Sequence, residues 1–171
     1  MNKKFTYPIY LFFVVLLFSL PTKSAENLKS LGKFKEWETF TVTENNNKIC
    51  FAQSIPILRA PKKFERDPSR LFISFRPSEG IKDEVSATSG YTFQKEKIVK
   101  AKTGKKSYDF FSQEKFAWIL DSEDEQKFIK AMKKASRVMI IGRTDQGKQT
   151  IDHYSLMGFT KAYNTAKKNC S

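Results

Sequence analysis

Histidine is almost absent from this sequence, which contains only His153. A zinc site with two histidines and an H-E-x-x-H motif are therefore excluded, because both need a second imidazole. The tetrapeptide Asp152-His153-Tyr154-Ser155 combines the residue types of a catalytic triad. Its segment reads as a strand, in which neighbouring residues point to opposite faces, so we interpret His153 as a residue on the surface of a strand.

Long hydrophobic runs are also lacking, apart from residues 7–20, YPIYLFFVVLLFSL. This run is shorter than the roughly 20 apolar residues that span a bilayer. Two lysines precede it and Ser24-Ala25 follow it, which is the layout of a secretory signal peptide. We predict a signal peptide over residues 1–25, cleaved near residues 24–25, and a single periplasmic or secreted domain over residues 26–171. The alternative is an uncleaved anchor that retains a structural envelope protein.

Cysteine is equally scarce, with only Cys50 and Cys170. In an oxidising compartment, two cysteines are the number needed for one disulfide, and two buried free thiols are the alternative. A disulfide would leave no thiol nucleophile and no cysteine cluster for a metal. We therefore expect neither a metal site nor a cofactor.

Acidic residues are few relative to basic ones: 18 Asp and Glu stand against 31 Lys and Arg, a net charge of +13. This surplus favours anionic partners such as lipid head groups or polysaccharide. Nucleic acid is disfavoured, because an exported protein rarely meets it and the sequence lacks an aromatic and basic RNA-binding motif.

Part of the basic surplus falls in residues 54–70, which also contain Pro56, Pro61 and Pro68. Because proline interrupts regular hydrogen bonding, we expect a long exposed loop here. Its basic residues form the candidate anion-binding site: Arg59, Lys62, Lys63, Arg66 and Arg70. A second basic region contains Lys95, Lys97, Lys100, Lys102, Lys105 and Lys106. The alternative for both regions is a solvated surface without a ligand.

The spacing of Gly142, Gly147 and Lys148 matches a phosphate-binding P-loop as far as its lysine. The next residue is Gln149, which has no hydroxyl for magnesium, and a strand-forming segment follows where a P-loop needs a helix. We predict that residues 144–148 form a hairpin turn, with Gly147 at a positive φ angle, and that the protein binds no nucleotide.

The rest of the chain favours short strands joined by turns. The strand-forming segments are residues 37–42, 48–53, 71–76, 85–93, 97–101, 107–111, 116–120, 137–142 and 149–155. Helical spacing occurs at about 122–135 and 156–168. Ser122 and Glu125 fit a capping box for the first helix, and Ser155 fits the N-cap of the second. We predict a mainly β, antiparallel β-sandwich-like domain of about 8–9 strands with two peripheral helices.

The order of these segments resembles the invasion-associated locus B family of exported bacterial proteins. The matching pieces are Trp37, KICFAQ at 48–53, RPSEG at 76–80, EVS at 84–86, Tyr91-Thr92-Phe93, Ala117-Trp118, AMKK at 131–134, Gly147, YSLMGFTKAY at 154–163 and Cys170. The resemblance implies a secreted, β-rich domain with a disulfide between Cys50 and Cys170 and without known enzymatic activity. In some pathogens such proteins are associated with invasion of host cells.

We therefore expect an exported, non-enzymatic binding protein of the bacterial envelope that contacts anionic envelope or host-surface components. The alternative is a periplasmic enzyme or enzyme inhibitor whose site forms only in three dimensions. A concave pocket with convergent polar groups and perturbed pKa values would favour an enzyme, whereas a convex basic or aromatic patch would favour a binding protein. The oligomeric state is not specified by these patterns.

Overall fold

The computed structural model describes residues 28–171, so the predicted signal peptide lies outside the described residues. The chain forms strands and helices in the following order: β1 (Lys29–Phe34), β2 (Trp37–Glu44), β3 (Asn47–Ser54), β4 (Leu58–Ala60), β5 (Arg70–Arg76), a 3-10 turn (Pro77–Glu79), β6 (Ile81–Thr88), β7 (Val99–Thr103), β8 (Lys106–Gln113), β9 (Phe116–Trp118), α1 (Ser122–Lys134), β10 (Arg137–Arg143), β11 (Gln149–Ser155) and α2 (Phe159–Asn169).

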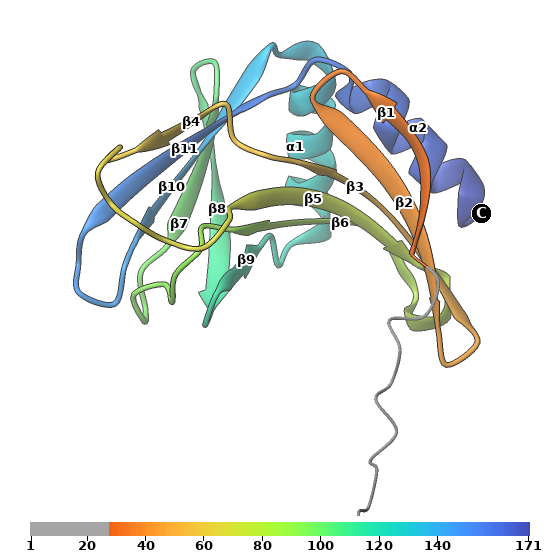
Figure 1. Cartoon of the computed structure of the whole chain (residues 1–171), viewed down its shortest axis with the longest axis horizontal. Helices are drawn as coiled ribbons and strands as arrows, with labels where there is room; N and C mark the ends of the chain where they lie inside the picture. Colours follow the sequence, from red (N-terminus) through yellow and green to blue (C-terminus); the bar gives the residue numbers. More distant parts are fainter. Residues whose placement is uncertain (1–27) are drawn as a thin grey trace, which may run out of the picture.

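The strands form one antiparallel sheet of 11 strands in the order β1-β2-β3-β5-β6-β9-β8-β7-β10-β11-β4. Strand β8 joins two parts of this sheet, because its Phe110 pairs with Val99 of β7 and the next residue, Phe111, pairs with Trp118 of β9. The sheet is strongly bent, and β5 and β6 form an arch in Figure 1. The predicted mainly β, antiparallel and sandwich-like fold is confirmed.

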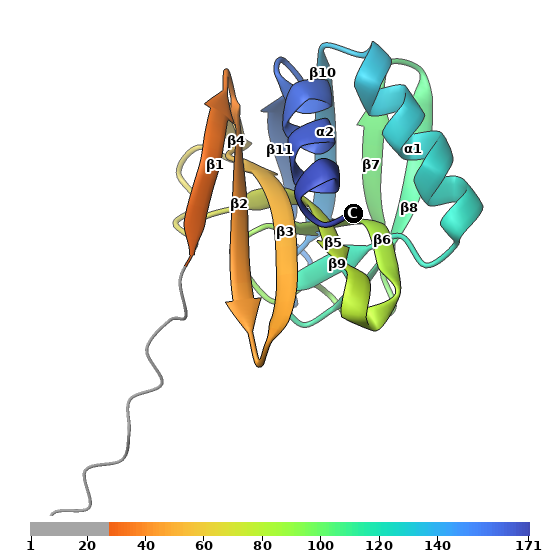
Figure 2. The ribbon, with the colours of Figure 1, turned by 90° about the vertical axis from the view of Figure 1, so that its right-hand side faces the viewer.

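Both helices pack on the same side of the arch, as Figure 2 shows. Helix α2 contacts β1, β2, β3 and β5, and α1 contacts β6. The fully buried Trp37 of β2 packs its ring against Phe159 of α2 at a centroid distance of 4.9 Å and donates its Nε1–H to the Ser155 carbonyl. Phe128 of α1 meets Phe110 of β8 edge to face at 5.5 Å. These aromatic contacts fill the hydrophobic core between helices and sheet.

The helix starts differ from the sequence prediction. The carboxylate of Asp121, not the Ser122 hydroxyl, caps α1 by accepting the backbone N–H of Asp124 at 2.8 Å, and Glu125 takes no part in a capping box. Ser155 belongs to β11, and the N-cap of α2 is Gly158 at φ +93°. A Cβ atom at Gly158 would lie 1.8 Å from the Phe34 carbonyl oxygen, so only glycine fits between α2 and β1.

Two strands were not predicted, and two predicted strands, at 85–93 and 116–120, end earlier than expected, at Thr88 and Trp118. Strand β1 lies in a polar segment without alternation, and it forms by pairing with β2. Strand β4 interrupts the predicted loop at residues 54–70, because Leu58–Ala60 pairs with β11. The predicted strand at 85–93 ends at Thr88, beyond which residues 89–93 turn away, with only an isolated bridge from Phe93 to Thr144.

The predicted disulfide between Cys50 and Cys170 is confirmed. The two Cα atoms lie 5.8 Å apart, and the bridge connects β3 to the residue that follows α2. It therefore fixes the end of α2 to the sheet. Within residues 28–171, neither helix has the length and hydrophobicity to span a membrane.

Candidate functional site

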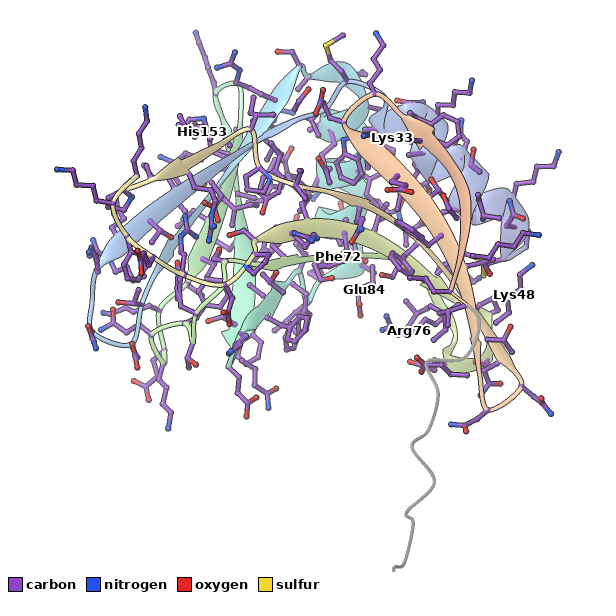
Figure 3. All side chains as sticks on the ribbon, viewed as in Figure 1. Lys33, Lys48, Phe72, Arg76, Glu84 and His153 are labelled. Carbon is purple, nitrogen blue, oxygen red and sulfur yellow. A yellow bond between two sulfur atoms is a disulfide. The ribbon has the colours of Figure 1, made fainter. Side chains whose placement is uncertain are left out.

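The face of the sheet that points away from the helices carries a group of aromatic side chains. Along β5, the buried residues Leu71, Ile73 and Phe75 alternate with Phe72 and Arg76 on the opposite face. In Figure 3, Phe72 and Arg76 lie below the arch formed by β5 and β6. The face of the sheet that points away from the helices therefore carries aromatic side chains that are not part of the hydrophobic core.

Strand pairing arranges these side chains as a slot. Phe51 of β3 lies opposite Ser74 of β5, and Phe72 lies opposite Ser86 of β6, which in turn lies opposite Trp118 of β9. Ser86 thus lies on the floor between Phe72 and Trp118, whereas Ser74 lies on the floor between Phe51 and Glu84. We define the aromatic slot by its walls and floor: Phe51, Phe72, Phe116, Trp118, Ser74 and Ser86. The hollow is open to solution and has a volume of about 560 Å³, within the roughly 300–1,000 Å³ of small-molecule sites.

The walls of the aromatic slot are accessible and continue into neighbouring rings. Phe116 exposes 52% of its surface. Phe51 meets Phe72 edge to face at 6.3 Å and stacks on Phe40 at 5.3 Å, whereas Trp118 meets Phe111 at 5.4 Å. These contacts support the Phe51, Phe72 and Trp118 rings in the absence of a ligand.

One end of the aromatic slot is closed by a charged group. The Arg76 guanidinium donates two hydrogen bonds to the Glu84 carboxylate, at 3.1 and 2.9 Å, and a third to Glu79 at 2.9 Å. Burial alone would lower the pKa of Arg76, but the hydrogen bonds to Glu84 and Glu79 outweigh it and raise the pKa above its usual value. Gln113 and Glu114 also line the hollow. The slot thus combines aromatic walls with fixed polar groups.

The candidate anion-binding residues do not form one exposed arm. Arg66 is buried, with 1% of its side chain exposed, and forms an ion pair with the fully buried Asp152 of β11. The same guanidinium donates to the Ser89 carbonyl at 2.6 Å and lies 5.7 Å from the centre of the Tyr91 ring. Arg66 therefore holds the loop against the sheet, and its charge is not available to a ligand in solution.

The other four candidates differ in accessibility. Arg59 donates to the Asp67 carbonyl at 2.6 Å, and Arg70 donates to the Ser69 carbonyl at 3.1 Å, so both bind the local backbone. Lys62 and Lys63 are exposed at the tip of the loop. An anion-binding role of this loop stays a prediction, and within residues 54–70 the lysine pair is the accessible part of the set.

The remaining motifs have structural explanations. Residues 144–148 form the predicted hairpin turn between β10 and β11, in which Gly147 has φ +82° and the Thr144 N–H donates to the Lys148 carbonyl. His153 is half-buried on β11, and its carbonyl accepts the Ile57 N–H at 2.8 Å. The second basic region lies on and before the β7–β8 hairpin, where Lys100 pairs with Asp109.

An acidic cluster lies under α1, where Glu125 reaches the sheet. Its carboxylate accepts the backbone N–H of Val85 on β6 at 2.7 Å. Burial, together with the nearby Glu84 and Asp83, raises the pKa of Glu125 to about 7, although the Val85 hydrogen bond opposes this. Asp83 in turn accepts a hydrogen bond from the Tyr163 hydroxyl of α2 at 2.6 Å. Glu125 therefore connects helix and sheet instead of capping the helix.

Sequence reasoning did not predict the aromatic slot. Phe72 stands between Ile73 and Leu71, and Phe51 between Cys50 and Ala52, so each aromatic residue occupies the non-core position of its strand. That placement was a usable signal, since a solvent-facing strand position is usually polar. The rings meet only because β6 and β9 are neighbours in the sheet although they are not consecutive in the sequence. The sequence of a single strand does not show this.

The fold is similar to that of a solved protein. The structure titled invasion associated protein B from Bartonella henselae aligns with a TM-score of 0.60 and 12% sequence identity, over 82% of this chain and 96% of that chain. No family model and no curated protein matches the sequence. The shared fold agrees with the resemblance seen in the sequence segments.

Proposed function

We propose that this chain is an exported, non-enzymatic binding protein of the bacterial envelope, related to the invasion-associated locus B family, and that it binds its partner in the aromatic slot. The observation that carries the proposal is the accessible aromatic face. Single exposed apolar residues are normal on a folded protein, whereas a contiguous exposed apolar patch commonly marks an interaction site or a ligand-binding groove. Within residues 28–171 both helices pack on the other face of the sheet, so the slot is open to solution.

Export is supported by three observations. The sequence has the pattern of a signal peptide, the fold contains a disulfide, and the similar structure is that of an invasion associated protein. Fractionation tests this part of the proposal. We expect the protein in the periplasmic or culture fraction, with an intact mass that lacks about 25 residues. A membrane fraction with full-length mass would instead indicate the uncleaved anchor.

A binding role, rather than catalysis, is supported by the chemistry of the slot. Its Arg76 and Glu84 are already bonded to each other, which leaves Glu114 as the lining carboxylate outside that ion pair, whereas acid–base cleavage of a glycosidic bond uses two carboxyl groups. The slot is concave, as enzyme sites commonly are, but its aromatic walls are typical of a binding surface. Anionic partners remain part of the proposal through the exposed Lys62 and Lys63, separate from the slot.

Photocrosslinking in living cells tests the slot as a binding site without assuming the ligand. We would replace Phe116, which is exposed inside the slot, with p-benzoylphenylalanine, and Thr160, which is exposed on α2, as the matched control. Covalent adducts of envelope material at position 116 but not at position 160 are expected. Equal adducts at both positions, or none at position 116, would refute the proposal.

A further inference from the structure

We infer that the aromatic slot binds a segment of a neutral oligosaccharide chain. This inference rests on the proposed function, because it names the ligand class for the same site. The width of the slot, the polar groups beside its walls and the sign of its charge all fit such a chain.

The width of the slot fits one layer of a six-membered ring. Phe72 on β5 and Trp118 on β9 are separated by the single strand β6. Neighbouring strands lie about 4.8 Å apart, so the two walls start from backbones roughly 10 Å apart. Carbon atoms in contact approach to about 3.5–4.0 Å, so a ligand held on both sides needs roughly 7–8 Å between the wall atoms. One ring layer can occupy this space, whereas two stacked layers cannot.

The floor and the end of the slot match the rim of a sugar ring. A pyranose has apolar C–H faces, which stack on aromatic rings, and a rim of hydroxyl groups that must find hydrogen-bond partners when they leave water. The Ser86 hydroxyl lies on the floor between Phe72 and Trp118, and the Ser74 hydroxyl lies on the floor between Phe51 and Glu84. Arg76 and Glu84 present a fixed guanidinium and carboxylate at one end, and Gln113 adds an amide to the lining.

The same polar groups disfavour an acyl chain. A hydrocarbon seated in the slot would cover Arg76 and Glu84 without offering them any hydrogen bond. Removing an ion pair from water without compensating hydrogen bonds is strongly unfavourable. A sugar replaces the displaced water with its own hydroxyls, so it avoids this cost.

The local charge disfavours an anionic chain. The slot lining contains one cation, Arg76, and two carboxylates, Glu84 and Glu114. The excess is negative at the slot although the whole chain carries +13. Like charges brought together at a binding surface oppose association, so a sulfated or phosphorylated polymer is repelled here. The saccharide that this site selects is therefore uncharged.

Tryptophan fluorescence offers a direct assay of this inference. The chain has two tryptophans: Trp37 is fully buried in the core, whereas Trp118 lines the slot. The purified exported protein would be titrated with uncharged hexamers of glucose, of mannose and of N-acetylglucosamine, and in parallel with dodecanoate and a heparin hexasaccharide. We expect at least one neutral hexamer to change the emission and to protect Trp118 from acrylamide quenching.

Variants locate the binding in the slot. Phe72→Ala removes one wall and Ser86→Phe fills the floor, and each should weaken hexamer binding at least tenfold while the melting curve stays cooperative. The matched control is Phe64→Ala, which removes a half-buried ring from the loop at residues 54–70 and should leave binding unchanged.

The remaining outcomes separate the inference from the proposed function. Binding of dodecanoate or heparin hexasaccharide at the slot, with no response to any neutral hexamer, would overturn the saccharide inference and leave the slot as a binding site. No response to any probe, together with an absence of crosslinks at position 116, would overturn both. Recovery of shortened hexamers after incubation would contradict the non-enzymatic role.

Discussion

Replacing Asp152 with asparagine would leave the guanidinium of Arg66 buried without its carboxylate. The two side chains expose 0% and 1% of their surfaces, so solvent cannot compensate the remaining charge. Removing one partner of a buried ion pair costs about 3–5 kcal/mol. For a chain of this size each kcal/mol lowers the melting temperature by about 2–4 °C, which gives an expected decrease of roughly 6–20 °C for Asp152→Asn.

Thermal and urea unfolding, followed by circular dichroism, would measure this loss. The matched control is Asp109→Asn, which breaks the exposed ion pair with Lys100. Exposed pairs contribute about 0–1 kcal/mol, so the control should melt within a few degrees of the unmodified protein.

A double variant tests whether the loss arises from the unpaired charge. Arg66→Met with Asp152→Leu removes both charges and should lose less stability than the sum of the two single variants, with a coupling of about 2 kcal/mol. Part of the loss will remain, because Arg66→Met also leaves the Ser89 carbonyl without its donor. If Asp152→Asn costs less than about 1 kcal/mol, or if the two substitutions are additive, the reasoning is wrong.

Three further predictions concern the disulfide, an acidic residue and the loop lysines. Cys50→Ser should destabilise the protein by up to about 5 kcal/mol, because the bridge closes a loop with a sequence separation of 120, and Cys170 should become open to alkylation; unchanged melting would contradict this. Burial raises the pKa of Glu125 from its ordinary 4.5 to about 7, so the folded protein retains a proton that the unfolded chain releases. The contribution of this proton to the stability should be complete below pH 4.5 and disappear as the pH rises through 7. Glu125→Gln should flatten the dependence of the melting temperature on pH over this range. An unaltered pH dependence in the variant would refute the raised pKa of Glu125. If the loop at residues 54–70 binds anions, the double variant Lys62→Gln/Lys63→Gln should be retained less strongly on heparin than the unmodified protein, without loss of stability. Elution of the variant and the unmodified protein at the same salt concentration would mean that the two lysines are only solvated.

Much of the fold was predictable because alternation marks half-buried strands. Leu71, Ile73 and Phe75 face the core at every second position of β5, and this period of two is visible in the sequence. Strands β1 and β4 escaped prediction because they form through pairing with a neighbouring strand rather than through their own side chains. Such short or polar edge strands carry little local signal.

The site was predictable only in part. The two cysteines could be paired from their number and compartment, since no other thiol competes. Arg66 looked like any other basic loop residue, because its partner Asp152 is 86 positions away in the sequence. The aromatic slot depends in the same way on the register that places Phe72, Ser86 and Trp118 in one row. Long-range strand register is set by the whole sheet and not by any single segment.

The position of the disulfide has a consequence for how the protein matures. All residues from β4 to α2 lie between the two cysteines, so Cys50 leaves the ribosome long before its partner. The sulfurs can meet only when α2 has reached β3, and until then Cys50 is a thiol open to other oxidants and other chains. We therefore expect Cys50 to remain without its native partner until the last helix has been made and has packed on the sheet. The fraction of Cys50 that can be alkylated, measured at successive times after synthesis, would show when α2 packs on the sheet and the disulfide forms.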